Sequence, residues 1–556
     1  FWRTWSWDAS AIDTILEGDD VTVERLMNED DIVTEIKTQN KKLVEFFTEK
    51  DNLSDLITYI TEPHEELTDE LQYRYPYIAC EVLCTDIYAI YELIFSTDEL
   101  LNQLIHFWYS DPPLNHLLAG YVNRVFSCFL AKRKPEIISA LKGKDDFLDV
   151  MLDRIETTHV VDLLVKLIAT DDAEVGTIEW MAENNLISKA IAKLENDNNE
   201  VTQNISQLLS SIIVISNQGL TNGGDTRLLQ ELENEETISK LFDNILASAK
   251  SPAFLHGSAI ITELIRNISS EIFDFGTSLD DAPAILKVLA KKMGRLNEFL
   301  LVKPDTPLNT TFGVLKPPFG MHRMKVLEII GMSLHSRYFC IYNSFMETPL
   351  LNTLVDLFFE YHWNNFLHAI VNRVLTLILE TNNSDLCLKM VVRTQLHTKL
   401  AECGLDDINS FNNDGYQRRG YMGFVTSLTS ALEETAGVNE DLANILGESE
   451  EWQEFLSGSY ADSQEIESKP LGGVAGAESS DDDEEEDQLL TYQQIVKRDF
   501  ENEFPKNFSV GDFEDPDIDS LLHPLPGTLY EGIICQEQDF GNEFESDDED
   551  TEDESS

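Results

Sequence analysis

Apolar residues recur at helical spacing along most of this chain. Val160, Leu163, Leu164, Leu167 and Ile168 form one such set, and similar sets lie at 260–265 and 367–378. Spacings of three and four residues place each set on one face of an α-helix, as a stripe that must be buried. Short polar or proline-containing breaks separate the sets, and no convincing strand pair is present. The pattern predicts an all-α fold of about 18–20 helices, most of them about 10–20 residues long.

The predicted helices are joined by short connections, which favours a stacked arrangement. A helix pair of this size cannot bury its apolar stripes alone and packs on its neighbours. Pairs recur at about 40 residues, a spacing typical of armadillo and HEAT repeats, although the repeats share no residue-level consensus. We therefore predict an armadillo/HEAT-like helical-repeat solenoid. A compact multi-helix bundle is the structural alternative.

Charge divides the chain into two parts. Residues 457–556 hold 31 acidic and 4 basic side chains, whereas the preceding residues hold 71 and 36. The C-terminal part includes the acidic runs 472–487 and 545–556. Mutual repulsion and low apolar content leave such a segment without a core. We predict a helical-repeat scaffold domain over 1–455 and an acidic, largely disordered tail over 456–556.

The net charge of −62 limits the class of partner. Nucleic acids and anionic lipid surfaces both require clustered cations, so this chain would be repelled by either. No apolar run approaches the ~20 residues of a membrane-spanning helix, and FWRTWSWDASAID lacks the apolar core of a signal peptide. Seven scattered cysteines indicate reduced thiols. We expect a protein-binding protein of the cytoplasm that a partner could also carry into the nucleus.

Signatures of catalysis are missing from the sequence. It contains no nucleotide-binding G-x-x-x-x-G-K-[ST] loop, no H-E-x-x-H zinc motif, no G-x-S-x-G elbow and no kinase motifs. Cys80 and Cys84 could share a metal, but no second pair with zinc-type spacing lies nearby, which favours two buried thiols. His362 and His368 lie six residues apart, a poor same-face spacing that favours packed histidines over ligands. We predict a non-enzymatic protein without a cofactor.

The stretch Gln-Arg-Arg-Gly-Tyr-Met-Gly at 417–423 is a cationic spot in a very acidic chain. Its two arginines could bind carboxylates of a partner in bidentate fashion. They could equally pair with the abundant Asp and Glu of the chain itself, and this internal pairing is slightly favoured. The stretch is the most distinctive one in the sequence.

Three serines of the acidic tail are followed closely by carboxylates. Ser479 and Ser480 precede a run of aspartates, and Ser546 precedes Asp-Asp-Glu. An acid-directed kinase could phosphorylate these sites, so we name them as candidate phosphorylation sites. The added charge would find little local structure to change, and a plain solvated tail is an equal alternative.

Several stretches, taken in order, resemble the SAPS family of phosphatase-associated proteins, which act as regulatory subunits of protein phosphatase 6. The resemblance covers about residues 1–434. The matching stretches are 12–47, YPYIACEVL (75–83), DPPLNHLLAGYVNRV (111–125), RKPEIISALKGKDDFLD (133–149), GVLKPPFG (313–320), LVDLFFEYHWNNFLHAIV (354–371) and RRGYMG (418–423). The chain departs from the family pattern at His116 and Phe424, where proline and histidine are expected.

The resemblance implies a helical-repeat scaffold that binds a protein phosphatase 6-type catalytic subunit and directs its substrate choice and location. It also implies that an ankyrin-repeat protein can complete a trimer, and that hydrolysis belongs to the catalytic subunit. The matched stretches contain the candidate partner-binding residues, which could instead serve packing: Asn364, Asn365, His368, Arg418, Arg419 and Tyr421. Two other functions remain open, a helical-repeat adaptor of another class, such as a transport or assembly factor, and an undetected hydrolase.

Overall fold

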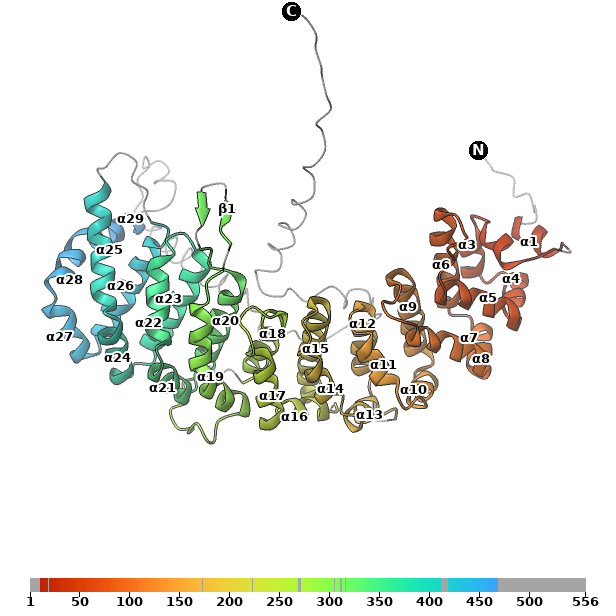
Figure 1. The fold of residues 1–556 in the computed structure, drawn as a ribbon, viewed down its shortest axis with the longest axis horizontal. Coiled ribbons are helices and arrows are strands. Elements are labelled where there is room, and N and C mark those ends of the chain that lie inside the picture. The colour runs from red at the N-terminus through yellow and green to blue at the C-terminus, as the bar shows by residue number, and fades with distance from the viewer. Residues whose placement is uncertain are drawn as a thin grey trace, which may run out of the picture. The chain divides into compact units, whose positions relative to one another are not determined.

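The computed structural model is almost entirely helical in the residues that it describes (Figure 1). Those residues are 11–18, 20–172, 174–222, 224–268, 272–304, 306–310, 313–315, 317–411 and 419–468. The prediction of an all-α helical-repeat fold is confirmed. The predicted number of helices was too low, because the described residues form 29 α-helices. Several have only five to seven residues, too few to show a full apolar stripe.

Eight helices form a central row in which each packs against the next (Figure 1). They are α6 (Asp69–Cys84), α9 (His116–Lys132), α12 (Thr158–Ala169), α15 (Asn199–Asn222), α18 (Pro252–Arg266), α20 (Met321–His335), α23 (Asn365–Glu380) and α26 (Met422–Ala436). Gly120 of α9 closely approaches the ring of His159, the second residue of α12. His368 near the start of α23 packs against Phe424 of α26. In both pairs the contact joins residues near the beginnings of the two helices, so these beginnings lie side by side.

In the middle of the chain the repeating unit has three helices, whereas the sequence predicted pairs. Two helices precede each of three central helices. Before α12 lie α10 (Lys134–Lys142) and α11 (Phe147–Asp153), and before α15 lie α13 (Thr177–Glu183) and α14 (Leu186–Lys193). Before α18 lie α16 (Arg227–Leu232) and α17 (Glu235–Ile245). A tight turn explains the difference for α13 and α14. Asn185, with a φ of 56°, reverses the chain within two residues, so the two short helices look like one in the sequence.

The remaining helices lie before, after and beside the central row. The N-terminal ones are α1 (Ala11–Leu16), α2 (Val23–Met27), α3 (Ile32–Lys37), α4 (Lys41–Phe47), α5 (Lys50–Thr61), α7 (Tyr88–Ser96), α8 (Asp98–His106) and η1 (Phe107–Tyr109). The later ones are α19 (Ala284–Leu301), α21 (Phe339–Glu347), α22 (Leu350–Glu360), α24 (Ser384–Thr394), α25 (Leu396–Phe411), α27 (Glu440–Glu448), α28 (Glu450–Phe455), η2 (Leu456–Tyr460) and α29 (Ala461–Glu467). None of the helices described is both long and apolar enough to span a membrane.

One short hairpin interrupts the helices, although no convincing strand pair was found in the sequence. Its strands β1 (Leu308–Thr310) and β2 (Gly313–Leu315) are antiparallel, with Leu308 opposite Leu315. Strands of three residues are too short to show the alternation that marks a strand in a sequence. The hairpin precedes α20 and lies near its beginning (Figure 1).

The predicted apolar stripes form the core. Val160, Leu163, Leu164 and Leu167 of α12 are all 0% exposed. The set at 367–378 is buried in the same way on α23. Because each central helix packs against the preceding and the following one, the core is continuous from unit to unit.

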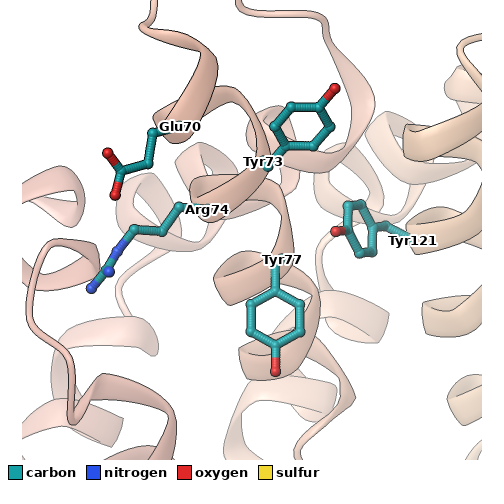
Figure 2. Close-up of a pocket in the computed structure, with 5 residues that line it drawn as sticks. All are labelled: Glu70, Tyr73, Arg74, Tyr77 and Tyr121. Carbon is teal, nitrogen blue, oxygen red and sulfur yellow. The ribbon is translucent and has the colours of Figure 1, made fainter.

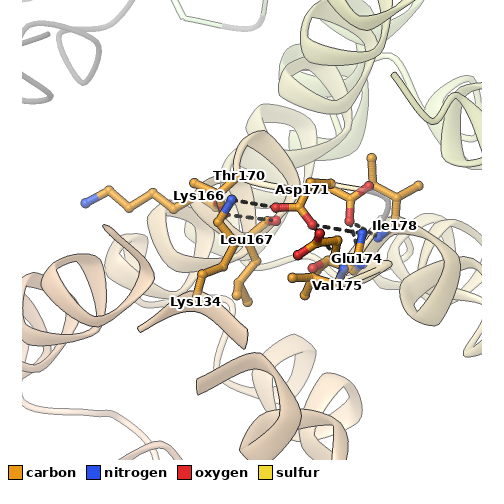
Figure 3. A network of polar contacts seen from close by, with 10 residues as sticks. Lys134, Lys166, Leu167, Thr170, Asp171, Glu174, Val175 and Ile178 are labelled. Carbon is orange, nitrogen blue, oxygen red and sulfur yellow. Dashed lines mark hydrogen bonds and ion pairs between the residues drawn. The ribbon is translucent and has the colours of Figure 1, made fainter. Parts of the chain in front are cut away.

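Polar contacts also join successive units. Lys134 pairs with Asp172 at 2.9 Å across 38 residues, and Lys193 pairs with Asp153 at 2.6 Å across 40 residues. Figure 3 shows the turn between α12 and α13, where Asp171 accepts hydrogen bonds from the amides of the first two residues of α13. The hydrogen bond from Lys134 lowers the pKa of Asp172. The separations match the predicted spacing of about 40 residues.

Helical structure continues beyond the predicted scaffold domain, through η2 to the end of α29 at Glu467. The domain boundary between 455 and 456 stays a prediction. The described part of the chain ends at 468. The acidic runs and the candidate phosphorylation sites Ser479, Ser480 and Ser546 lie outside the described residues, as does Arg418.

Two helical glycines provide a matched test of the packing between neighbouring helices. A Cβ at Gly257 of α18 would lie 2.7 Å from Cγ1 of Ile245 at the end of α17, whereas a Cβ at Gly294 of α19 would meet nothing within 4 Å. We expect Gly257→Ala to lower the free energy of unfolding by about 1–3 kcal/mol through overpacking. Gly294→Ala should raise it by about 0.5–1 kcal/mol, because alanine favours a helix. Urea unfolding followed by far-UV circular dichroism measures both, and equal effects would contradict the packing described.

Candidate protein-binding edge

Three of the family-like stretches, far apart in the sequence, meet where α20, α23 and α26 begin. Arg323, the third residue of α20, donates from Nη2 to the carbonyl of Pro318 (2.9 Å) and to the hydroxyl of Tyr361 (2.8 Å), just before α23. The loop after Tyr361 in turn contacts Gly420, just before α26. We call residues 317–323, 361–368 and 419–424 the motif edge.

Arg323 holds the first two segments together from inside the protein. Its side chain is fully buried, and its Nε donates to the carbonyl of Phe319 at 2.6 Å. The guanidinium also lies over the rings of Phe319 and Tyr361, 4.3 and 5.1 Å from their centroids. A buried charge is tolerated only when it is well bonded, so these contacts fix the loop before α20 against the loop before α23.

Gly420 lets the second and third segments touch. A Cβ at this position would lie 3.0 Å from the carbonyl oxygen of His362 and 3.1 Å from the Trp363 ring. Any larger residue would push the two loops apart. The glycine of the RRGYMG stretch therefore has a packing role that depends on a loop 57 positions earlier in the chain.

His368 is a packed histidine, as the sequence favoured. Its side chain is 0% exposed, and its Nε2 donates to the carbonyl of Phe358 at 3.1 Å. The rings of Phe358, Tyr421 and Phe424 surround it at centroid distances of 4.8, 5.4 and 5.9 Å. Burial lowers the pKa of His368, so the ring is neutral at pH 7. His368 cannot touch a partner in this conformation.

Arg419 and Tyr421 are also engaged within the chain. Tyr421 is 1% exposed, and its hydroxyl accepts a hydrogen bond from Nη1 of Arg419 at 3.0 Å. The thiol of Cys403 lies 3.6 Å from the same hydroxyl. Burial raises the pKa of Tyr421, which keeps the hydroxyl protonated. Internal engagement of Arg419 was expected, but its partner is a tyrosine hydroxyl rather than the expected carboxylate.

The exposed residues of the motif edge differ from most of the predicted ones. Asn364 caps α23 by accepting from the amide of Leu367 (3.1 Å), and Asn365 is exposed. Beside them, Trp363 is 51% exposed and Phe366 is 41% exposed. Met321, at the start of α20, is 39% exposed. The exposed apolar side chains were missed, although Asn364 is a recognisable N-cap that would have placed Phe366 in the first turn.

Cys80 and Cys84, the pair that could share a metal, lie on one helix. The Sγ atoms of Cys80 and Cys84 lie 3.8 Å apart on α6, and only Cys80 is fully buried. Within the part of the chain that the structure describes, no group of three or more His, Cys, Asp or Glu side chains is placed to hold a metal ion. What the motif edge offers is an exposed apolar surface on a rigid base, which suits a protein partner.

Comparison with known proteins identifies relatives. The family model SAPS, described as SIT4 phosphatase-associated protein, matches residues 126–469. Serine/threonine-protein phosphatase 6 regulatory subunit 3-B of Xenopus laevis is 29% identical, over 83% of this chain and 59% of its own length. Regulatory subunit 1 of Mus musculus is also 29% identical, over 83% of this chain and 60% of its own. The chain thus spans about three fifths of the length of these relatives.

Among solved structures, an engineered protein aligns over 82% of this chain and 98% of its own length. The TM-score is 0.38 and the sequence identity is 12%. A similarity this low carries no argument about fold or function, so the helical-repeat architecture rests on the helices described above.

The buried neutral state of His368 predicts a pH dependence. The folded pKa lies below the ordinary value of 6.5, so the unfolded chain takes up protons first as the pH falls. The stability that depends on neutral His368 is therefore present above about pH 6.5 and decreases below it. We expect the urea midpoint to fall between pH 7 and pH 5, and His368→Phe to make that fall shallower. An unchanged slope in the variant would contradict the assignment, whatever its effect on the midpoint at pH 7.

Proposed function

Because this chain belongs to the SAPS family of SIT4 phosphatase-associated proteins, we propose that it is a non-catalytic regulatory subunit of a serine/threonine protein phosphatase. It binds a protein phosphatase 6-type catalytic subunit and directs the choice of substrate and the location of that subunit. The relatives reported above are named as regulatory subunits of phosphatase 6, and hydrolysis belongs to the bound catalytic subunit. The observation that carries the proposal for this chain is the motif edge.

The motif edge combines an exposed apolar surface with a rigid base. Trp363 and Phe366 are large rings at the start of α23 that are 51% and 41% exposed, and aromatic side chains are enriched at the core of protein interfaces. Arg323 and Gly420 fix the loops beneath them. A surface held in its bound conformation loses little entropy on association. This edge is therefore the best candidate contact for the catalytic subunit.

The proposal assigns different roles to the six predicted contact residues. Asn365 is exposed beside Trp363 and is placed to contact the partner. Asn364 and Arg419 are partly buried and hold the loops in place. His368 and Tyr421 act only through packing, since both are buried. Arg418, which lies outside the described residues, is still proposed to bind the partner, as the resemblance implies.

The complex is proposed to act in the cytoplasm, with a nuclear pool carried by a partner. An ankyrin-repeat protein is proposed as a third subunit. The third subunit is inferred from the resemblance, and the location is inferred from the seven scattered cysteines and the lack of a signal-peptide pattern. A helical row of this kind has room for more than one partner, because each unit presents its own exposed face.

Affinity purification of the tagged chain from its own cells tests the function. Near-stoichiometric recovery of a protein phosphatase 6-type catalytic subunit is the expected result. Its reproducible absence, with another protein in its place, would replace the phosphatase role by that of another adaptor. Phosphatase activity of the purified chain alone would contradict the non-catalytic role.

Substitution of the two exposed rings tests the site. We expect Trp363→Ala with Phe366→Ala to reduce recovery of the catalytic subunit at least about tenfold, since interface anchors of this type each contribute about 2 kcal/mol or more. Val392→Ala, which truncates a 58% exposed apolar side chain on α24, is the matched control and should leave recovery unchanged. Both variants should keep the urea midpoint of the unmodified chain. Full recovery with the double variant would move the interface away from the motif edge.

A further inference from the structure

A second exposed surface lies at the beginning of the central row, on α6 and α9. An open hollow of about 380 Å³ is lined there by Glu70, Tyr73, Arg74, Tyr77 and Tyr121. Figure 2 shows the three tyrosine rings on one side of this hollow, with Glu70 and Arg74 on the other. We call it the tyrosine hollow. Its volume is near the lower end of the range for ligand sites, enough for one long side chain and its flanking backbone.

Tyr73 and Tyr77 are not part of the hydrophobic core. Tyr73 and Tyr77 lie four residues apart on one face of α6, where they are 63% and 46% exposed. The apolar residues that face the core, such as Ile78 and Val82, are 3% and 0% exposed. Tyr121 comes from the neighbouring helix α9 and is half-buried. Two largely exposed tyrosines beside a third one make a surface with aromatic faces and hydroxyls available to a partner.

The cation in the lining is already bonded to another part of the chain. Arg74 donates from Nε to the carbonyl of Met27 (3.1 Å), and from Nη2 to the carbonyl of Asn28 (3.0 Å) and to Asp30 (3.1 Å). Its guanidinium therefore completes the C-terminal end of α2 and points away from the rings, as Figure 2 shows. Arg124, one turn after Tyr121, is paired with Glu81 at 2.7 Å.

The carboxylates beside the hollow, by contrast, have no lysine or arginine partner among the described residues, although Nδ1 of His64 lies 3.1 Å from Glu66. Glu70 makes no ion pair with any residue that the structure describes. Glu62, Glu65, Glu66 and Asp69 precede it and are exposed, and no lysine or arginine occurs between residues 51 and 73. The hollow thus combines the negative faces of three rings with an excess of negative charge, which is the arrangement that binds an organic cation.

We propose that the tyrosine hollow binds a basic peptide segment of a partner protein, with an arginine or lysine side chain inserted between the rings. The cation would lie against the faces of Tyr73, Tyr77 and Tyr121, and Glu70 would neutralise its charge. The proposal does not rest on the phosphatase role, because it concerns a surface separate from the motif edge. It adds a second binding surface that recognises positive charge.

Fluorescence anisotropy with the full chain tests the proposal. The probe is a fluorescein-labelled peptide, Ser-Gly-Arg-Gly-Arg-Gly-Ser, and its comparison peptide carries citrulline, the neutral analogue, at both arginine positions. We expect Tyr73→Ala with Tyr77→Ala to weaken binding of the arginine peptide about tenfold at unchanged net charge. Glu70→Gln should weaken it in the same direction. The citrulline peptide should bind at least about tenfold more weakly than the arginine peptide.

Two control variants isolate the rings. Tyr73→Phe with Tyr77→Phe keeps the aromatic faces and should restore binding. Tyr88→Ala removes a 74% exposed tyrosine that does not line the hollow and should have no effect. Equal binding by the unmodified chain and the double alanine variant would overturn the proposal, since attraction to an acidic chain as a whole would then explain it. Equal binding of both peptides would overturn it too, because the rings would then recognise an uncharged backbone.

Discussion

Burial of one apolar stripe between two neighbours is the interaction on which this structure depends. A central helix such as α12 has α9 before it and α15 after it, and its stripe residues are shielded only when both are in place. No unit can bury its own stripe, so stability spreads along the row as a series of contacts between adjacent units. The same arrangement leaves the helix beginnings and the connecting loops uncovered. The motif edge lies at such a place, where the exposed side chains are not needed to fill the core.

Ion pairs add to the contacts that this packing makes between units. The body carries many more acidic than basic groups, and its cations are largely used in pairs between units, such as Lys193 with Asp153 and Lys134 with Asp172. Exposed pairs of this kind contribute little stability individually. They do leave the remaining carboxylates unmatched, so the surface is negative wherever a loop lacks lysine or arginine. The segment before Tyr73 is such a place, and its charge follows from how the cations are distributed elsewhere.

The sequence predicted the helices because an apolar stripe is set by residues only three or four positions apart. It also found the stretches that form the motif edge, through their resemblance to a family. It could not tell which of their residues face outward. His368 is buried because α26 begins beside it, more than fifty residues later, whereas Trp363, five residues before His368, is 51% exposed. The same long-range packing decides that Tyr421 lies inside and Phe366 outside. The sequence prediction missed the turn at Asn185 and the three-residue strands for a different reason, because each is too short to leave a periodic signal.

The buried polar groups of the motif edge serve to select one conformation of its loops more than to raise the stability of the fold. A buried arginine held by two carbonyls, a hydroxyl and two rings contributes little net stability compared with an apolar side chain of equal volume. What it does is allow only one arrangement of the loops around Tyr361, because any other would leave the charge without partners. His368 acts similarly, since the hydrogen bond from its Nε2 to the carbonyl of Phe358 orients the ring. If the motif edge binds a partner as proposed, a surface that presents Trp363 and Phe366 in one geometry gains more from such constraints than from additional apolar packing.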